Sequence, residues 1–334
     1  MTGPFNILLT SAGRRVSLGR LLREDAAALG FTPRLVVAEM HPGLSAAAAA
    51  ADARHAVPAA THPDYVPTLL DICRREDIRL LVPTIDTELN ALAAHRALFE
   101  AAGVLVNVSS PAAIDIARNK AETARVLSAA GIGTPRTAWP HEVLAAPGDW
   151  NWPLIFKPNG GSSSVGLRQV GTVSELAEAL AMWPDGIVQD LIRGPEYTVN
   201  MFVGPDGACR AAVPHLRREL RGGEVSKGIT VRRQDMTDAA HAIAAALPGA
   251  FGALCFQAFA TADGPVVFEI NARFGGGFPL AHQAGARFTR WLIQLAAGAA
   301  PDLSDDWTDG VTMLRYDDAI FGVAGPDERA AWLG

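Results

Sequence analysis

The stretch "LIFKPNGGSSSVGLRQV", residues 154–170, places a lysine and a small polar loop between two apolar runs. Loops rich in glycine either turn tightly or let backbone amides approach an anion. The apolar runs predict two strands, so we expect the loop at the tip of a β-hairpin. Folded over a polyphosphate, the loop would donate backbone N–H groups while Lys157 supplies positive charge. A surface turn without a ligand is the alternative interpretation.

Two other motifs do not fit this loop. A Walker A motif needs Lys followed by Ser or Thr at the start of a helix, whereas Leu167 and Arg168 follow the last glycine. A nucleophile elbow needs a serine flanked as G-x-S-x-G, and none of the three serines is so flanked. The pattern therefore favours phosphate binding over a serine nucleophile.

Lysine is rare in this chain, which makes each lysine informative. Only Lys120, Lys157 and Lys227 occur among 29 basic residues, so the other 26 are arginines. A lysine that persists under such a bias is a candidate for a chemical role. Chance survival at scattered positions is the alternative.

A second hairpin is predicted by "CFQAFATADGPVVFEINARFGGG", residues 255–277. A three-residue loop at 262–264, with glycine last, would place Thr261 opposite Pro265. Counting back along both strands places Gln257 opposite Glu269.

One face of this hairpin is expected to be polar, because side chains alternate along a strand. The polar face would carry Gln257, Glu269, Asn271 and Arg273. The other face would carry Phe268 and Ile270. Magnesium takes one or two protein oxygens together with phosphate oxygens, which this cluster would provide. A solvated sheet face is the alternative.

The elements that must position these groups alternate along residues 1–108. Apolar extended runs and amphipathic runs follow one another in a βαβ rhythm, which predicts a parallel sheet covered by helices. The first strand-to-helix turn, "TSAGRRV", has one glycine where a dinucleotide fingerprint needs three. Arg14 and Arg15 at that helix start are instead candidates for holding a substrate anion.

The rest of the chain divides into two further parts. Ser110 and Pro111 open a pair of short helices that contain Lys120. Residues 187–334 read mainly as strands, with a late helix in "ARFTRWLIQLAAG". We expect an α/β fold that becomes α+β toward the C-terminus, with units at 1–112, 113–190 and 191–334.

Composition restricts the partners. A formal charge of -6 argues against a nucleic-acid or anionic-membrane surface, which needs clustered basic residues. Three scattered cysteines support neither a disulfide framework nor a zinc site. We therefore expect a cytoplasmic protein that acts on small molecules. A homo-oligomer is possible.

Taken in order, Lys120, "FKPNGGSSSVG", "VQDLIRGPEYTVN", "CFQAF" and "FEINARFGGG" resemble the ATP-grasp superfamily. The Gln-Glu-Asn set is similar to the carbamoyl-phosphate-synthase large-subunit branch. The resemblance covers about residues 5–300 and implies an ATP-grasp fold preceded by a Rossmann-like domain. The chain lacks the duplicated halves of the synthase, so carbamoyl phosphate synthesis itself is not expected.

The resemblance also implies roles for individual residues. Residues expected to hold ATP are Lys120, Lys157, Gly160, Gly161, Ser162, Ser163, Ser164, Val165, Gly166, Gln189, Asp190, Leu191, Ile192 and Glu196, with Glu196 on the ribose. Residues expected to hold two magnesium ions, which manganese could replace, are Gln257, Glu269 and Asn271. Residues expected to act on the transferred phosphoryl group are Arg273 and Lys227. Gln189 departs from the glutamate common in the family, which leaves the adenine contact open.

By the resemblance, the chain would be an ATP-dependent ligase that activates a carboxylate as an acyl phosphate and joins it to an amine. Substrates would be small and amino-acid-like. A kinase-like enzyme that releases the phosphorylated carboxylate is one alternative, and a non-catalytic nucleotide-binding module is another. The arginine-rich segment 215–233 could bind substrate carboxylates or be a solvated loop.

Overall fold

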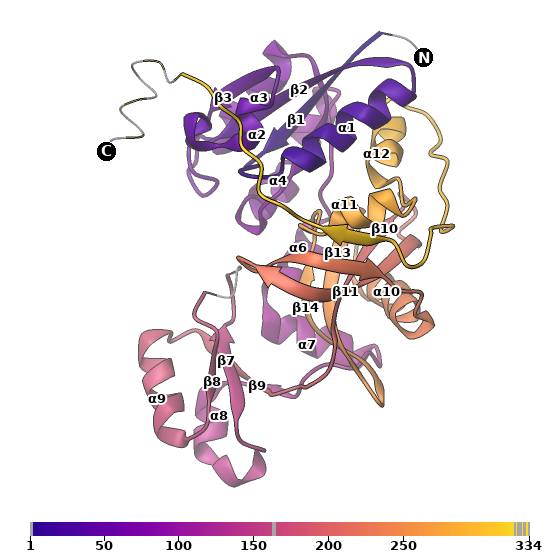
Figure 1. The fold of residues 1–334 in the computed structure, drawn as a ribbon. Helices are drawn as coiled ribbons and strands as arrows, with labels where there is room; N and C mark the ends of the chain where they lie inside the picture. The colour runs from indigo at the N-terminus through magenta and orange to yellow at the C-terminus, as the bar shows by residue number, and fades with distance from the viewer. Residues whose placement is uncertain (1–2, 162–164, 324, 326–328, 330–331, 333–334) are drawn as a thin grey trace.

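The computed structural model describes residues 3–161, 165–323, 325, 329 and 332. Three sheets organise the chain, and Figure 1 shows them in an upper domain, a central body and a small lower lobe. No described helix is both long and apolar enough to cross a membrane.

The N-terminal domain is a five-stranded parallel sheet with strand order β3-β2-β1-β4-β5. Its strands are β1 (Gly3–Thr10), β2 (Phe31–Glu39), β3 (Ala53–Ala56), β4 (Ile78–Pro83) and β5 (Leu105–Val106). Its helices are α1 (Val16–Ala28), η1 (Pro42–Leu44), α2 (Ala46–Ala49), α3 (Tyr65–Arg75), η2 (Asp86–Glu88), α4 (Leu89–Ala94) and α5 (Arg96–Ala101). The predicted parallel sheet is confirmed.

The strand order reverses at β1, which lies between β2 and β4. At such a switch point the loops after neighbouring strands diverge and leave a crevice at their carboxyl ends. The segments that follow β1 and β4 carry Arg14, Arg15 and Asp86. The topology therefore directs these three side chains toward the rest of the molecule.

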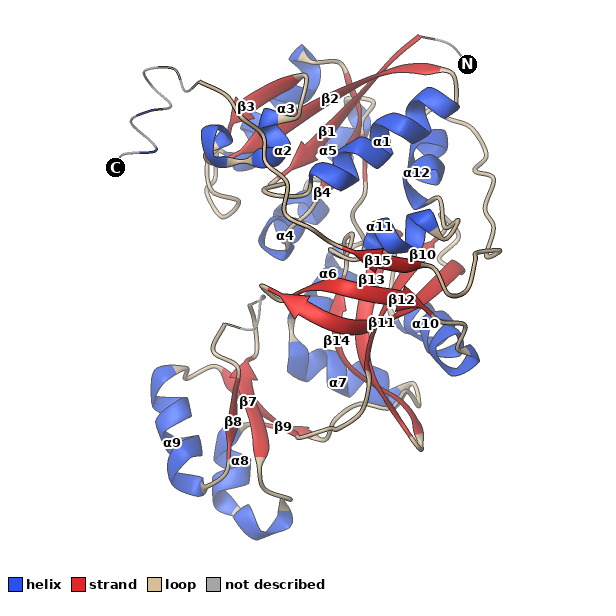
Figure 2. Cartoon of the chain, in the orientation of Figure 1, coloured by secondary structure: helices blue, strands red, loops and turns tan. Residues whose placement is uncertain are grey.

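The lower lobe is a four-stranded antiparallel sheet of order β6-β9-β7-β8 with its own small core (Figure 2). The strands are β6 (Thr137–Ala138), β7 (Leu154–Pro158), β8 (Arg168–Val170) and β9 (Gly186–Asp190). Helices α8 (Pro140–Ala145) and α9 (Val173–Met182), with η3 (Pro147–Asp149), complete it. The predicted hairpin around the glycine-serine loop is confirmed as β7 and β8.

The central body is a six-stranded sheet of order β14-β13-β10-β11-β12-β15. Its strands are β10 (Glu196–Val203), β11 (Cys209–Arg221), β12 (Glu224–Thr230), β13 (Gly252–Thr261), β14 (Gly264–Asn271) and β15 (Thr312–Leu314). The surrounding helices are α6 (Pro111–Arg118), α7 (Lys120–Ala129), α10 (Gln234–Ala246), α11 (Phe278–Gln283) and α12 (Phe288–Ala296). Helix α10 was not predicted, because residues 187–334 read mainly as strands.

The predicted helix start at Ser110 is confirmed, and a second helix start has the same kind of cap. Ser110 Oγ accepts a hydrogen bond from Ala113 N at 3.2 Å and caps α6, with Pro111 at its first position. Thr172 Oγ1 caps α9 by accepting from Glu175 N at 3.2 Å. These local hydrogen bonds satisfy amides that a helix start leaves unpaired.

We expect Phe202→Ala to lower the free energy of unfolding by about 3–5 kcal/mol. The Phe202 ring on β10 is fully buried and lies 5.5 Å from the Phe288 ring and 5.1 Å from the Trp291 ring of α12. Urea unfolding followed by circular dichroism measures the change. Phe321→Ala is the control, because that ring is 92% exposed, and equal losses in both variants would contradict the prediction.

Candidate functional site

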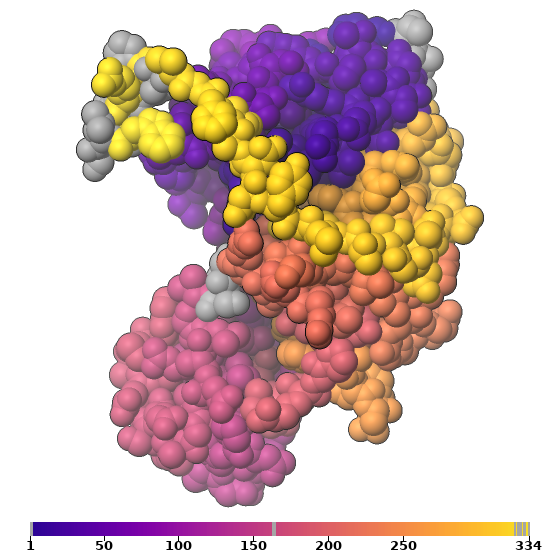
Figure 3. All heavy atoms as spheres, viewed as in Figure 1, coloured from indigo at the N-terminus to yellow at the C-terminus, as the bar shows by residue number. Residues whose placement is uncertain are grey.

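A cavity of about 520 Å³ lies where the three parts of the chain meet. Figure 3 shows the hollow between the lower lobe and the body above it. The predicted residues that line the cavity are Lys120, Lys157, Gly160, Gly161, Val165, Glu196, Gln257, Glu269, Asn271 and Arg273. Groups predicted from five separate sequence motifs therefore line one space.

Lys157 on β7 reaches into this cavity although its side chain is buried. Its Nζ donates to the Phe268 carbonyl at 3.3 Å and lies 5.6 Å from the centre of the Phe268 ring. Burial lowers the pKa of Lys157 to about 8, against the opposing attraction of Glu269. A phosphate group in the cavity would supply the counter-charge that this ammonium group has only in part.

Lys120, the first residue of α7, holds the base of the glycine-serine loop. Its Nζ donates to the Gly161 carbonyl at 3.0 Å and to the Asn159 carbonyl at 3.4 Å. Burial lowers the pKa of Lys120 as well. Gly161 adopts a φ of +97°, which a residue with a side chain rarely adopts. Ser162, Ser163 and Ser164 lie outside the described residues.

The β13-β14 hairpin has the predicted pairing at its functional end. Gln257 pairs with Glu269, but Thr261 pairs with Gly264 rather than Pro265. The turn is therefore one residue shorter than expected, and a bulge at Phe268 restores the register.

The bulge also changes which side chains of β14 face the cavity, so the predicted face of Phe268 was wrong. Phe268 lines the cavity beside Glu269 instead of facing away, and its ring stacks on Phe259 at 4.9 Å. The polar cluster thus has a flat aromatic wall next to it.

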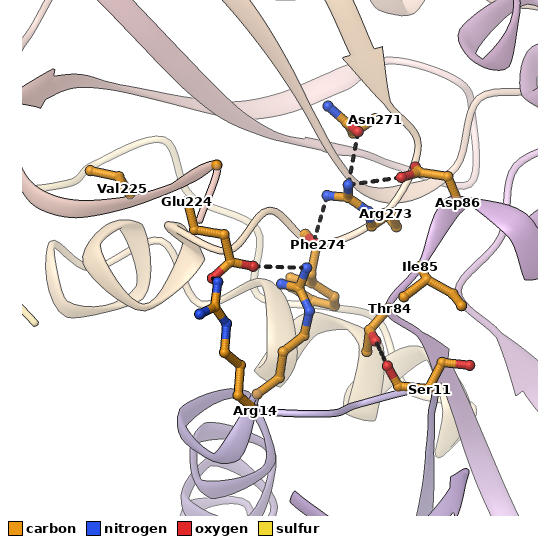
Figure 4. Close-up of polar contacts among 12 residues, drawn as sticks. Ser11, Arg14, Thr84, Ile85, Asp86, Glu224, Val225, Asn271, Arg273 and Phe274 are labelled. Atoms are coloured by element: carbon orange, nitrogen blue, oxygen red, sulfur yellow. Dashed lines mark hydrogen bonds and ion pairs between the residues drawn. The ribbon is translucent and has the colours of Figure 1, made fainter. Parts of the chain in front are cut away.

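Arg273 lies between two acceptors at the end of this hairpin (Figure 4). Its Nη2 donates to Asp86 Oδ2 at 2.9 Å and to Asn271 Oδ1 at 2.8 Å, and its Nη1 donates to the Phe274 carbonyl at 3.2 Å. Asp86 follows β4 in the N-terminal domain. This ion pair joins the switch-point crevice to the central sheet and fixes the guanidinium in place.

Comparison with known families agrees with this geometry. The model of an ATP-grasp domain matches residues 117–277. Residues 117–277 form an ATP-grasp domain. A PylC-like N-terminal domain matches residues 7–107, which is the parallel-sheet unit.

Curated relatives match only part of the chain. A D-alanine–D-alanine ligase of Stutzerimonas stutzeri is 35% identical over an alignment of 121 residues, and the match covers 32% of this chain and 36% of the relative. One from Oleidesulfovibrio alaskensis is 36% identical over an alignment of 137 residues, and the match covers 38% of this chain and 42% of the relative. The chain thus spans about two fifths or less of the length of these relatives.

Solved structures share the fold over most of the chain. The biotin carboxylase domain of Hydrogenobacter thermophilus 2-oxoglutarate carboxylase, in complex with MgADP, has a TM-score of 0.72 at 16% identity, covering 92% of this chain and 73% of that one. An L-amino acid ligase from Bacillus licheniformis has a TM-score of 0.65 at 18% identity, covering 87% and 74%. The predicted ATP-grasp fold is confirmed.

Arg217 on β11 also lines the cavity, whereas its segment, residues 215–233, was equally compatible with a solvated loop. Its Nη1 donates to Gln257 Oε1 at 2.6 Å and also to Glu196, and its Nη2 donates to the Gly223 carbonyl at 2.7 Å. Burial raises the pKa of Glu196, and the charge of Arg217 opposes that rise. Arg217 therefore engages both the predicted ribose ligand and one predicted metal ligand.

A second charged cluster joins the ATP-grasp domain to the start of α1. Glu224 on β12 accepts from Arg315 Nη1 at 2.8 Å and lies 3.3 Å from Arg15 and 3.6 Å from Arg14. Arg14, Arg15 and Glu224 line the cavity, whereas Arg315 does not. The expectation that the two arginines could face a substrate is consistent with this placement.

Several predicted residues lie away from the cavity. Lys227 donates to Glu219 Oε2 at 2.7 Å, and its side chain is half exposed on β12. Gln189 Nε2 donates to Thr137 Oγ1 at 2.9 Å within the small sheet. The remaining predicted residues that do not line the cavity are Gly166, Asp190, Leu191 and Ile192. The roles that the resemblance implies for these residues stay predictions.

The polar cluster suits magnesium only in combination with phosphate oxygens. Among the described residues, no three His, Cys, Asp or Glu side chains gather as a metal site. Glu269 supplies the one carboxylate of the predicted set, while the amide oxygens of Asn271 and Gln257 already accept from arginines. Magnesium prefers such sparse protein ligation when it arrives with a polyphosphate.

We expect the affinity for MgATP to fall about tenfold as pH rises from 7 to 9. Lys157 is protonated below its pKa of about 8 and loses its charge above it, whereas phosphate binding requires the charged form. Calorimetric titration at pH 7, 8 and 9 measures this. Lys157→Arg stays charged throughout and should show a smaller decline. An identical pH dependence in both proteins would contradict the prediction.

Proposed function

We propose that this protein is an ATP-dependent ligase that activates a carboxylate as an acyl phosphate and joins it to an amine, releasing ADP and phosphate. The observation that carries the proposal is that Glu269, Asn271 and Arg273 line one cavity together with Lys120 and Lys157. The partial matches to D-alanine–D-alanine ligases and the fold of an L-amino acid ligase support it.

Each side chain has a task in such a reaction. Lys120 and Lys157 bind phosphate oxygens, and the loop around Gly160 and Gly161 covers them. Glu269 would hold magnesium, with the amide oxygens of Asn271 and Gln257 as further ligands. When bound, magnesium neutralises phosphate charge and orients the γ-phosphoryl group. We propose two such ions, which manganese could replace.

The chemistry then follows in two steps. A carboxylate oxygen of the substrate attacks the γ-phosphorus, and the bond to the ADP oxygen breaks. The amine attacks the carbonyl carbon of the acyl phosphate, the bond to the phosphate oxygen breaks with its electron pair, and the amine nitrogen loses a proton. Arg273, held by Asp86, stabilises the charge that develops on the phosphoryl and acyl oxygens.

We propose that the substrates are amino-acid-like. The lining of the cavity carries both signs of charge, with Arg14 and Arg15 beside Glu224. A substrate that carries a carboxylate and an ammonium group could pair with both signs. Arg273 lines the same cavity and lies close enough to Arg15 for its charge to add to the lowering of the Arg15 pKa by burial, so a substrate carboxylate there would meet both guanidinium groups.

The test is ADP release with MgATP against a panel of amino acids, supplied singly and in pairs. Glu269→Ala is the blank, and Glu219→Ala is the control for a glutamate outside the cavity. Turnover that requires a carboxylate and an amine together, and that Glu269→Ala abolishes, would support the ligase. Turnover with a carboxylate alone would favour the kinase-like alternative. Nucleotide binding without turnover on any pair would count against the ligase.

A further inference from the structure

A second hollow lies in the N-terminal domain, next to the cavity described above. It is a groove of about 740 Å³ that is lined by residues of α3, η2, α4 and α5. Sites for small organic ligands commonly measure about 300–1,000 Å³. Its size is therefore that of a ligand site rather than of a packing defect.

The body of this groove is apolar. It is lined by Pro63, Val66, Leu70, Ala91 and Leu98, and half of the Leu98 surface is exposed. An exposed leucine beside a hollow of this size leaves apolar surface in contact with water, which a ligand with an apolar body would remove.

The charged groups that line the groove are all basic. Arg74 and Arg118, with His62 and His95, are among its lining residues, and none of the described lining residues is Asp or Glu. Within the described ranges neither arginine forms a salt bridge, and Arg118 Nη1 donates to the neutral Oδ1 of Asn90. In a chain with a formal charge of -6, this local excess favours an anionic ligand.

The short helix η2 connects the groove to Arg273. Thr87 lines the groove, and the neighbouring Asp86 in η2 accepts from Arg273. Glu88, which follows Thr87, is fully buried, and its carboxylate accepts hydrogen bonds from Tyr65 OH at 2.5 Å and from Thr84 N at 2.8 Å. A displacement of η2 by a ligand would therefore be transmitted to the position of Asp86.

A second connection runs through the junction of α6 and α7. Arg118 lines the groove, and Lys120, two residues later, holds the Gly161 carbonyl. A recess of about 20 Å³, lined by Thr87 and Arg118 and also by Lys120, lies between the two hollows. That volume admits about one water molecule, so the groove is separate from the catalytic cavity although it adjoins it.

We propose that this groove binds a small molecule with an apolar body and one anionic group, and that its occupancy changes the affinity of the catalytic site for MgATP. The basic groups select the anion, and the apolar body of the groove takes the hydrocarbon part. Because coupling between two sites is reciprocal, MgATP must change the affinity for the groove ligand by the same factor. Binding in the groove does not depend on the ligase chemistry, and the coupling requires only that the protein bind nucleotide.

Calorimetric titration of the full-length protein with decanoate tests whether the groove binds such a ligand. Decylammonium tests the need for negative charge, and acetate tests the need for the hydrocarbon tail. We expect saturable 1:1 binding of decanoate and at least tenfold weaker binding of the other two. Arg74→Glu and Ala91→Trp should each weaken decanoate binding at least tenfold. Arg75→Glu, the adjacent residue on α3 that does not line the groove, should leave it unchanged.

The coupling is tested by titrating MgATP with and without saturating decanoate. We expect saturating decanoate to change the dissociation constant of MgATP at least about fivefold in the wild type and to leave it unchanged in Arg74→Glu. Equal binding of decanoate and decylammonium, or decanoate binding that survives both groove variants, would overturn the proposed site. Decanoate binding that leaves MgATP affinity unchanged would overturn the coupling.

Discussion

Arg273→Lys is expected to lower the turnover number at least about 10³-fold while changing the dissociation constant of MgATP less than tenfold. The guanidinium donates to Asp86, Asn271 and the Phe274 carbonyl at once, so its position is fixed before the substrate binds. A lysine ammonium is a point charge on a flexible stem and cannot reproduce this fork. Removal of an arginine that stabilises a transferring phosphoryl group costs about 10³–10⁵ in rate. Coupled measurement of ADP release and calorimetric titration of MgATP separate the two effects.

Arg290→Lys is the matched control, because Arg290 pairs with Asp302 at 2.9 Å on α12, outside the cavity. Asp86→Asn tests the positioning role of the partner. It should lower turnover less than Arg273→Lys does, because the guanidinium keeps its bond to Asn271. Wild-type turnover in Arg273→Lys would exclude a catalytic role for this arginine.

Glu269→Gln is expected to reduce ADP release about 10²–10³-fold and to raise the magnesium concentration needed for half-maximal rate. Glu269 is the one carboxylate of the predicted metal set, and its pairing with Gln257 places it at the cavity wall. The amide keeps the shape of the side chain but removes its charge. Rates measured across a magnesium titration at fixed ATP distinguish weaker metal binding from misfolding.

Glu219→Gln provides the comparison, since Glu219 carries the same charge but pairs with Lys227 away from the cavity. It should titrate with magnesium as the wild type does. The same magnesium requirement for Glu269→Gln and wild type would remove Glu269 from the metal site.

Much of the fold could be predicted because its signals are local. The apolar strands of the N-terminal sheet, the caps at Ser110 and Thr172, and the glycine turns need only neighbouring residues to form. The parts that were not predicted depend on distant partners. The ion pair between Asp86 and Arg273 is of this kind. Helix α10, in contrast, was missed although its buried residues, which are Met236, Ala239, Ala240, Ile243 and Ala244, follow the spacing of an amphipathic helix.

In the β13-β14 hairpin, the predicted pairing of Gln257 with Glu269 is confirmed although the predicted turn was one residue too long. The shorter turn shifts the register by one residue, and the bulge at Phe268 shifts it back. Alternation along a strand fixes which side chains share a face only where the strand is regular. The sequence pattern therefore placed Glu269 correctly and Phe268 wrongly.

By itself, the sequence determined the order of the motifs, the parallel N-terminal sheet, and the gathering of Lys120, Lys157 and Glu269 near a glycine loop. The tertiary structure alone decided which charges meet. Asp86 reaches Arg273 across 187 residues, and Arg217 reaches Gln257 across 40. Backbone hydrogen bonding and side-chain periodicity act over a few residues, and they specify elements. Ion pairs between elements arise only after packing brings the elements together, so no local pattern encodes them.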